Sequence, residues 1–322
     1  MFGSMRPLFI LVVAILFLAP GGAGGATARA AGEDGGAPVG EPGPPPTPTA
    51  FDGDGMWIWY VSRAGGGSVQ RIAATAKRRG IETVFIKSSD GGRYWGQFSR
   101  RLVRKLKRRG LNVCAWQYVY GDRPTTEAAV GARAVRAGAD CLVLDAESQY
   151  EGKYASARKY VRSLRARIGA DYPLGLAGFP YVHYHPAFPY SVFLGPGGAQ
   201  FNLPQMYWRA IGTTVSRVYS TTYLYNRVYG RPIHPLGQVY QNPPTAEILR
   251  FRSLAAANGA TGVSWWSWHT ATRRGWRAVA RPLPSPVDPA PKRRKQRMYP
   301  LLKRRARGDL VVWAQQHLVA AG

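Results

Sequence analysis

The sequence predicts an α/β protein built as a (β/α)8 TIM barrel. Between Gly55 and about Ala280, eight short apolar segments alternate with helical segments, which is the count and size expected of such a barrel. Three of the predicted helices end at a glycine, Gly80, Gly110 or Gly138, and glycine after the last turn is a strong helix stop. No glycine-rich phosphate loop follows the first predicted strand, which counts against the alternative of a doubly wound sheet.

Hydrophobic periodicity assigns the elements in chain order. The predicted strands are 56–61, 83–87, 112–119, 141–144, 174–178, 201–207, 233–240 and 262–268. The predicted helices are 68–79, 98–109, 126–137, 154–168, 215–228, 245–258 and a short closing helix at 274–280. The second half is less regular, because a long aromatic and Pro-rich loop follows the fifth strand.

The N-terminus has the features of a secretory signal peptide over residues 1–30. Arg6 precedes the apolar run Leu8–Leu18, and Ala28-Arg29-Ala30 forms an A-x-A cleavage site. The apolar run is short for a bilayer crossing, so we expect no stable membrane anchor, with an uncleaved anchor as the alternative. The expected location is extracellular.

Composition places the remaining boundaries. A Pro/Gly-rich linker is predicted at 31–54, the barrel at 55–281 and a Pro-rich basic linker at 282–298. Residues 299–322 form a partial C-terminal helical module, too short to fold independently.

The chain is strongly basic, with 44 Lys+Arg, 17 Asp+Glu and a formal net charge of +27. Such a surplus indicates a polyanionic environment, namely nucleic acid, an anionic membrane face or an acidic cell wall. The signal peptide argues against nucleic acid as a partner, and we expect a monomer. Cys114 and Cys141 are compatible with one disulfide or with two buried thiols. No Cys/His spacing predicts a metal, and no cofactor is expected.

Two carboxylates follow the fourth predicted strand. Asp145 and Glu147 stand at i and i+2, so their side chains leave a strand on the same face. The carboxyl ends of barrel strands carry the chemistry of such folds. The alternative is that Asp145 caps the loop while Glu147 is a solvated loop residue. Because two close carboxylates disfavour double ionisation, we assign Glu147 as a general acid and Asp145 as its pKa partner or stabiliser. Asp90, after the second strand, is the candidate for a second acid/base group.

The other predicted strand ends are rich in aromatic and amide side chains, which suit the apolar faces and hydroxyls of a sugar. Part of this set is expected to fill the core instead. Tyr207 is the candidate to bond the reacting substituent of the substrate. The predicted substrate-binding residues are Tyr207, Gln205, Trp116, Tyr118, Trp59, Gln238, Tyr240 and Trp266.

Several segments resemble known families. LDAES at 144–148 resembles the strand-four D-x-E of family 25 lysozymes and the end of the D-x-x-D-x-D-x-E motif of family 18 chitinases. FIKSSDGG at 85–92 resembles the second-strand segment of the lysozymes, where an acid occupies the position of Asp90, and QMYW and SWW resemble the sixth and eighth chitinase strands. The chain departs from family 25 in having Met56-Trp57-Ile58-Trp59 where those enzymes carry an Asp, and Cys141 and Val143 replace the earlier chitinase acids.

The tail has its own resemblance. Gly308-Asp309-Leu310-Val311, Ala314-Gln315 and Leu318 resemble the opening of a bacterial peptidoglycan-binding domain. Together, the resemblances imply a secreted glycoside hydrolase of the TIM-barrel superfamily, associated with the cell wall and acting on peptidoglycan glycan. The alternative is a non-catalytic barrel that binds wall polysaccharide or an anionic wall polymer, and a nucleic-acid binder is the third choice.

Overall fold

The computed structural model describes residues 48–281 and 301–320. The predicted signal peptide, most of the linker at 31–54 and the linker at 282–298 lie outside the described residues. Within those two ranges, no helix combines the length and the apolarity that a bilayer crossing requires.

Eight parallel strands form the sheet of an α/β TIM-like fold. They are β1 (Gly53–Ile58), β2 (Thr83–Asp90), β4 (Asn112–Val119), β5 (Cys141–Ala146), β6 (Leu174–Ala177), β7 (Phe201–Asn202), β8 (Leu236–Gln238) and β9 (Gly262–Trp266). Their order is β7-β6-β5-β4-β2-β1-β9-β8. Isolated parallel bridges then join Asn202 to Ile233 and Gln205 to Leu236, so the two ends of the curled sheet meet.

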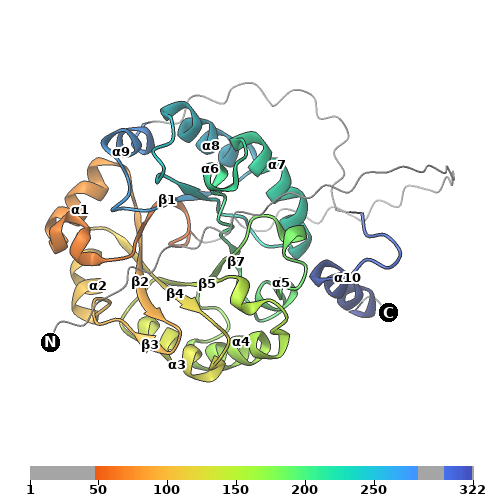
Figure 1. Cartoon of the computed structure of the whole chain (residues 1–322). Helices are drawn as coiled ribbons and strands as arrows, with labels where there is room; N and C mark the ends of the chain where they lie inside the picture. Colours follow the sequence, from red (N-terminus) through yellow and green to blue (C-terminus); the bar gives the residue numbers. More distant parts are fainter. Residues whose placement is uncertain (1–47, 282–300, 321–322) are drawn as a thin grey trace, which may run out of the picture. The chain divides into compact units, whose positions relative to one another are not determined.

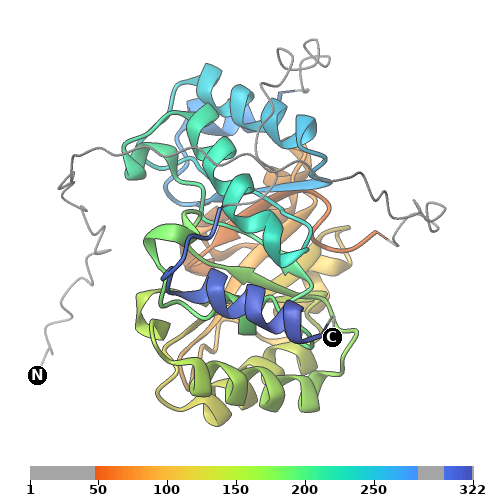
Figure 2. The ribbon, with the colours of Figure 1, turned by 90° about the vertical axis from the view of Figure 1, so that its right-hand side faces the viewer.

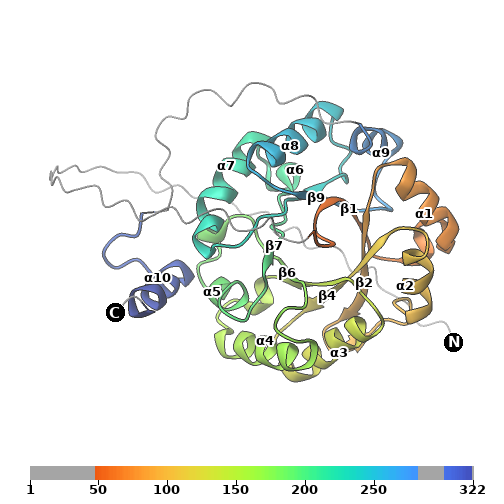
Figure 3. The same cartoon turned by 180° about the vertical axis from the view of Figure 1, so that it is seen from behind.

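A ring of helices surrounds the strands (Figure 1; Figure 3 gives the view from behind). The larger ones are α1 (Val69–Arg78), α2 (Arg100–Lys107), α3 (Pro124–Arg136), α4 (Tyr154–Ile168), α7 (Val215–Asn226), α8 (Thr245–Ala257) and α9 (Arg273–Val279). Figure 2 shows the strands between the yellow-green helices of residues 124–168 and the blue-green helices of residues 215–257. The sequence did not predict three short elements, α5 (Tyr190–Phe193), α6 (Trp208–Ile211) and β3 (Arg93–Tyr94), the last antiparallel to β2.

Local chemistry explains why most helix bounds agree with prediction. The Ser68 side chain accepts a hydrogen bond from the Arg71 N–H and caps the start of α1. Gly80 follows the end of α1 with a φ of +67°, a conformation that L side chains rarely adopt.

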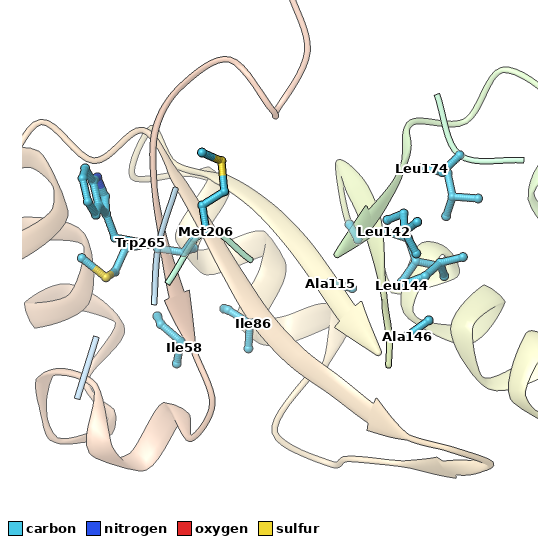
Figure 4. Packing of buried hydrophobic residues seen from close by; sticks show 14 of the residues in the cluster. Ile58, Ile86, Ala115, Leu142, Leu144, Ala146, Leu174, Met206 and Trp265 are labelled. Atoms are coloured by element: carbon cyan, nitrogen blue, oxygen red, sulfur yellow. The ribbon is translucent and has the colours of Figure 1, made fainter. Parts of the chain in front are cut away.

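The core has two layers on opposite faces of the strands. Between the strands and the helices lie Ile58, Ile86, Leu142 and their neighbours, all fully buried (Figure 4). A second cluster, rich in aromatic rings, fills the inside of the barrel. Phe51 belongs to it and is 3% exposed, so this residue of the predicted linker packs inside the barrel.

The inner cluster contains a disulfide. Cys114 on β4 and Cys141 on β5 are register partners in the parallel ladder, and their sulfur atoms are bonded. Of the two alternatives that the sequence left open, the structure therefore has the bond. It ties together the two strands that carry Tyr118 and Asp145.

The closing seam of the barrel, between β7 and β8, is less regular than the prediction of strands at 201–207 and 233–240. Pro204, Pro232 and Pro235 lie in this seam. Proline has no N–H, so it cannot donate to a strand ladder. The seam still forms backbone hydrogen bonds on the other groups, for example from the Met206 N–H to the Leu236 carbonyl at 2.8 Å.

Helix α10 (Asp309–Ala320) belongs to the predicted C-terminal module, and it begins at a buried acid. The Asp309 carboxylate accepts hydrogen bonds from the Ser191 N–H (2.8 Å), the Ser191 hydroxyl (2.6 Å) and the Tyr229 hydroxyl (2.8 Å). Leu310 and Trp313 pack against the outer core. Described residues of the module therefore contact the barrel through side chains rather than forming a core of their own.

Candidate functional site

The candidate site is built around the end of β5. Asp145 is the penultimate residue of this strand and is 7% exposed, while Glu147 follows the strand in extended conformation and is partly exposed. The Gln205 Nε2 atom donates to Asp145 Oδ1 at 2.9 Å and to Glu147 Oε1 at 3.2 Å. One amide therefore contacts both carboxylates. From the sequence, we expect the two side chains to leave the strand on the same face.

The surroundings of this acid pair favour protonation. Burial raises the pKa of Asp145 well above its ordinary value, and the nearby Glu147 charge adds to the effect. Burial also raises the pKa of Glu147, against the hydrogen bonds from Gln205 and Tyr118, which favour the ionised form. Since two close carboxylates share protons as a unit, we expect the pair to retain one proton well above the pH at which exposed carboxyls ionise.

Tyr118 brings a third polar group to the pair. Its hydroxyl lies 2.7 Å from Gln149 Oε1 and 3.3 Å from Glu147 Oε2. Burial and the neighbouring carboxylates raise the pKa of Tyr118 far above its ordinary value. The hydroxyl thus stays protonated and able to donate to Glu147 when that carboxyl ionises.

Asp90 forms a separate ion pair at the end of β2. Its Oδ2 lies 2.6 Å from Lys87 Nζ, and its Oδ1 accepts from the Tyr120 hydroxyl at 2.7 Å. Both carboxylate oxygens are therefore engaged. Asp90 lies in electrostatic range of Asp145, because its charge is among the causes that raise the pKa of Asp145.

Lys87 is a site residue that was absent from the predicted set. Its side chain is 2% exposed, and the ammonium lies 4.6 Å from the ring centroid of Trp116 and 4.9 Å from those of Trp59 and Trp95. Such rings stabilise a cation that has left water. The available signal was spacing, since Phe85 and Lys87 at i and i+2 share a strand face and Phe85 belongs to the inner cluster.

Three tryptophans lie together beside the lysine, Trp116 on β4, Trp266 on β9 and Trp59 directly after β1. The rings of Trp59, Trp116 and Trp266 lie 5.4 to 6.0 Å apart between centroids. Trp116 is 1% exposed and therefore part of the core, whereas Trp59 and Trp266 are partly exposed at the rim. The predicted aromatic set thus divides between a filled interior and a rim available to a ligand.

The remaining predicted residues fall into two groups. Tyr207 is partly exposed and lies in electrostatic range of both acids, which add to the rise in its pKa that burial causes. Tyr240 packs edge-on against Tyr207, with centroids 5.5 Å apart. Gln238 is fully buried and its Oε1 accepts from the Arg209 N–H of α6 at 2.8 Å. The structure therefore places Gln238 outside the cluster, where it supports α6.

Two histidines of the loop after β6 lie near the site without joining the acid pair. His185 Nδ1 is 2.7 Å from Glu151 Oε1, and burial lowers the pKa of His183 to about 4. Across the described ranges, no three His, Cys, Asp or Glu side chains are grouped in a way that could hold a metal ion.

Fold and site together define a class, a parallel barrel with paired acids and aromatic rings at the carboxyl ends of its strands. No protein-family model matches this sequence, and no curated protein matches it. Solved structures with a similar fold include several glycoside hydrolases. A class V chitininase from Pseudomonas fluorescens Pf-5 aligns with a TM-score of 0.54 at 12% identity, over 70% of this chain and 98% of that one.

Two further structures extend the comparison. An endo-beta-1,4-mannanase from Thermotoga petrophila aligns with a TM-score of 0.52 at 11% identity, over 68% of each chain. A putative Chitinase A from Streptomyces coelicolor aligns with a TM-score of 0.50 at 13% identity, over 72% of this chain and 98% of that one. At these identities the likeness establishes the fold, and the chemistry has to be argued from the site.

Proposed function

We propose that this protein is a secreted glycoside hydrolase that cleaves cell-wall glycan, with Glu147 as the general acid. The observation that carries the proposal is the bridging of Asp145 and Glu147 by the single Gln205 amide at the strand ends. Glycoside hydrolysis requires a carboxyl that still holds its proton when it meets the leaving oxygen. Burial of both acids raises their pKa values and meets that requirement.

The first step transfers the Glu147 proton to the glycosidic oxygen as the bond from that oxygen to the anomeric carbon breaks. Glu147 then carries a negative charge, which the Gln205 amide and the Tyr118 hydroxyl stabilise by donating to it. In the proposal the pair delivers its one shared proton from Glu147, and Asp145, ionised at that stage, stabilises the positive charge that forms on the sugar. Gln205 and Tyr118 thus favour the ion that forms during the reaction.

The contacts of Asp90 bear on which group attacks the anomeric carbon. Both of its oxygens are engaged by Lys87 and Tyr120, so the proposal assigns it to holding the lysine rather than attacking the sugar. A 2-acetamido sugar can supply its own carbonyl oxygen to the anomeric carbon, as substrate-assisted glycosidases require. Water then opens this intermediate and returns a proton to Glu147. Peptidoglycan glycan has such 2-acetamido groups, and the proposal gives Tyr207 the role of bonding one.

The test uses the purified chain on peptidoglycan sacculi and on N-acetylglucosamine oligomers, with release of reducing ends as the readout. Glu147→Gln is expected to abolish release while leaving the thermal unfolding midpoint close to that of the wild type. Glu151→Gln is the matched control, since Glu151 is an exposed carboxylate four residues further along and should leave release unchanged. Equal release by the Glu147→Gln protein would refute the assignment.

A second candidate is a non-catalytic barrel that binds wall polysaccharide. The observation that favours it is the packing of Trp59 against Trp116 and Trp266, at the end of the segment 56–59 where family 25 lysozymes carry an Asp. In that case the wild type would sediment with sacculi and release no product, and Trp59→Ala would weaken sedimentation. Release of reducing ends by the wild type but not by Glu147→Gln would favour the hydrolase over the non-catalytic barrel.

A further inference from the structure

A basic groove lies at the amino-terminal end of the strands, opposite to the candidate site. It has a volume of about 570 Å³ and runs along α2 to the end of α3. Lys107 and Arg108 precede β4, and Ala137 and Gly138 precede β5, which fixes the groove at this end of the barrel. Five of its lining residues are cations, namely Arg100, Arg104, Lys107, Arg108 and Arg136.

The charges of this groove are poorly compensated. Lys107 pairs with Asp140 at 2.5 Å. Among the described residues, no carboxylate forms an ion pair with Arg100, Arg104, Arg108 or Arg136, and none lines the groove. Their side chains are exposed, and the Arg100 Nη2 atom donates to the Arg136 carbonyl at 3.2 Å, which joins the two helices beside the groove. An anionic ligand can therefore approach these guanidinium groups from solvent.

The charge pattern of α2 acts against the stability of the free helix. Arg100 and Arg101 occupy its first turn, where the helix dipole favours acids, and the helix contains no acid at all. Arg100 and Arg104, and Arg104 and Arg108, stand four residues apart, the spacing at which like charges on a helix repel. The ion pair of Lys107 with Asp140 offsets part of this repulsion, and a bound polyanion would offset more of it.

The spacing suits a linear polyanion better than a single small anion. Four residues of α-helix rise about 6 Å, so Arg100, Arg104 and Arg108 present charges at intervals of about 6 Å along one face. Arg136 adds a further guanidinium from α3 across the groove. Arginine matches phosphate oxygens with two parallel N–H donors.

We propose that the groove between α2 and α3 binds a phosphodiester-linked polyol polymer of the bacterial cell wall. Single-stranded nucleic acid is the competing polyanion, but proteins hold it through aromatic rings that stack on the bases. The groove has none, since its uncharged lining consists of Val103, Ala137 and Gly138. This site anchors the chain on the wall and is separate from the acid pair.

The test measures binding of a fluorescein-labelled poly(glycerol phosphate) oligomer to the full chain by anisotropy, over a series of salt concentrations. The groove variant is Arg104→Ala with Arg108→Ala and Arg136→Ala. The matched control removes three exposed cations of α4, Arg158→Ala with Lys159→Ala and Arg162→Ala. Thermal unfolding confirms that both variants are folded.

We expect the groove variant to bind roughly tenfold more weakly and its slope of log affinity against log salt to fall by about 2, since each lost phosphate contact removes about 0.7 to 0.9. The α4 control and Glu147→Gln should both bind like the wild type. Equal losses in the groove variant and the α4 control would show that only net charge matters and would overturn the site. A single-stranded DNA oligomer of equal charge that binds more tightly than the polymer would overturn the choice of partner. Because Glu147→Gln keeps the groove intact, failure of the hydrolase proposal and failure of this one give different results.

Discussion

Replacing Gln205 by Leu tests the reasoning about the acid pair most directly. The substitution keeps a side chain of similar size and removes the one amide that donates to Asp145 at 2.9 Å and to Glu147 at 3.2 Å. A hydrogen bond to a charged group contributes about 1.5–3 kcal/mol, and one pKa unit corresponds to about 1.36 kcal/mol. Since Glu147 is partly exposed and water can replace part of the loss, we use the lower end of this range.

The apparent pKa at which the pair ionises is therefore expected to rise by about one unit in Gln205→Leu. Because the same amide stabilises the Glu147 anion formed on proton transfer, hydrolysis should fall roughly ten- to a hundredfold. The pKa is read from the ¹³C carboxyl shifts of Asp- and Glu-labelled protein, assigned with Asp145→Asn and Glu147→Gln. This readout does not depend on activity.

Gln70→Leu is the control, because Gln70 is an exposed amide on α1. It should leave both carboxyl titrations and the rate unchanged. An unchanged or lowered pKa of the pair in a folded Gln205→Leu protein would refute the claim that this amide stabilises the ionised form.

Three further predictions concern stability. Asp145 has a raised pKa in the folded protein, so its contribution to stability is fully present below its unfolded pKa of about 3.9 and declines as the pH rises through the raised value. Asparagine does not ionise. The Asp145→Asn protein should therefore gain stability relative to the wild type from pH 4 to pH 8, measured by urea unfolding. The Cys114–Cys141 bond spans 27 residues, which corresponds to about 3.5 kcal/mol of loop-closure entropy, so reduction should lower the melting temperature by roughly 7–14 °C. Asp309→Ala leaves the buried Ser191 N–H without its partner and should weaken the docking of α10 by about 2 kcal/mol, seen as faster hydrogen exchange in residues 309–319.

Each of the three stability predictions would be contradicted by a specific outcome. A stability difference between Asp145→Asn and the wild type that stays constant with pH would contradict the raised pKa. A melting temperature insensitive to reductant, with both thiols alkylated after unfolding, would contradict the stabilising role of the disulfide. Unchanged exchange in α10 of Asp309→Ala would show that Leu310 and Trp313 hold the helix without the acid.

Helix positions could be predicted well because their signals are local. The helix at 154–168 has the bounds of the prediction, and α1, α2, α8 and α9 differ from it by one or two residues. N-terminal caps and C-terminal glycines act within one turn of the helix end, so they can be recognised in the sequence without knowledge of the rest of the fold. The strand β3 has only two residues, too few to show an alternation of apolar and polar side chains. The prolines shorten β7 and β8, and a prediction from hydrophobicity alone does not detect this effect.

The candidate site could be predicted only in part. Strand periodicity placed Asp145 and Glu147 on one face, and they share a hydrogen-bond partner in the structure. That partner, Gln205, lies 60 residues from Asp145 in the chain, and the contact depends on the sheet order, in which β6 lies between β5 and β7. The partner of Gln238 is the backbone of α6, a helix of four residues that the sequence did not reveal.

The proline-rich seam has a consequence for the dynamics of the site. β4 and β5 share six register pairs, but β7 meets β8 through two isolated bridges. Segments with fewer ladder hydrogen bonds open at lower free energy in native proteins. Gln205 forms one of those two bridges, so the amide that joins the acids belongs to a part of the barrel wall with few ladder pairs. Local opening of the seam would move Gln205 away from the acids, so stiffening residues 201–207 should slow proton exchange at the carboxylates as well as at the backbone.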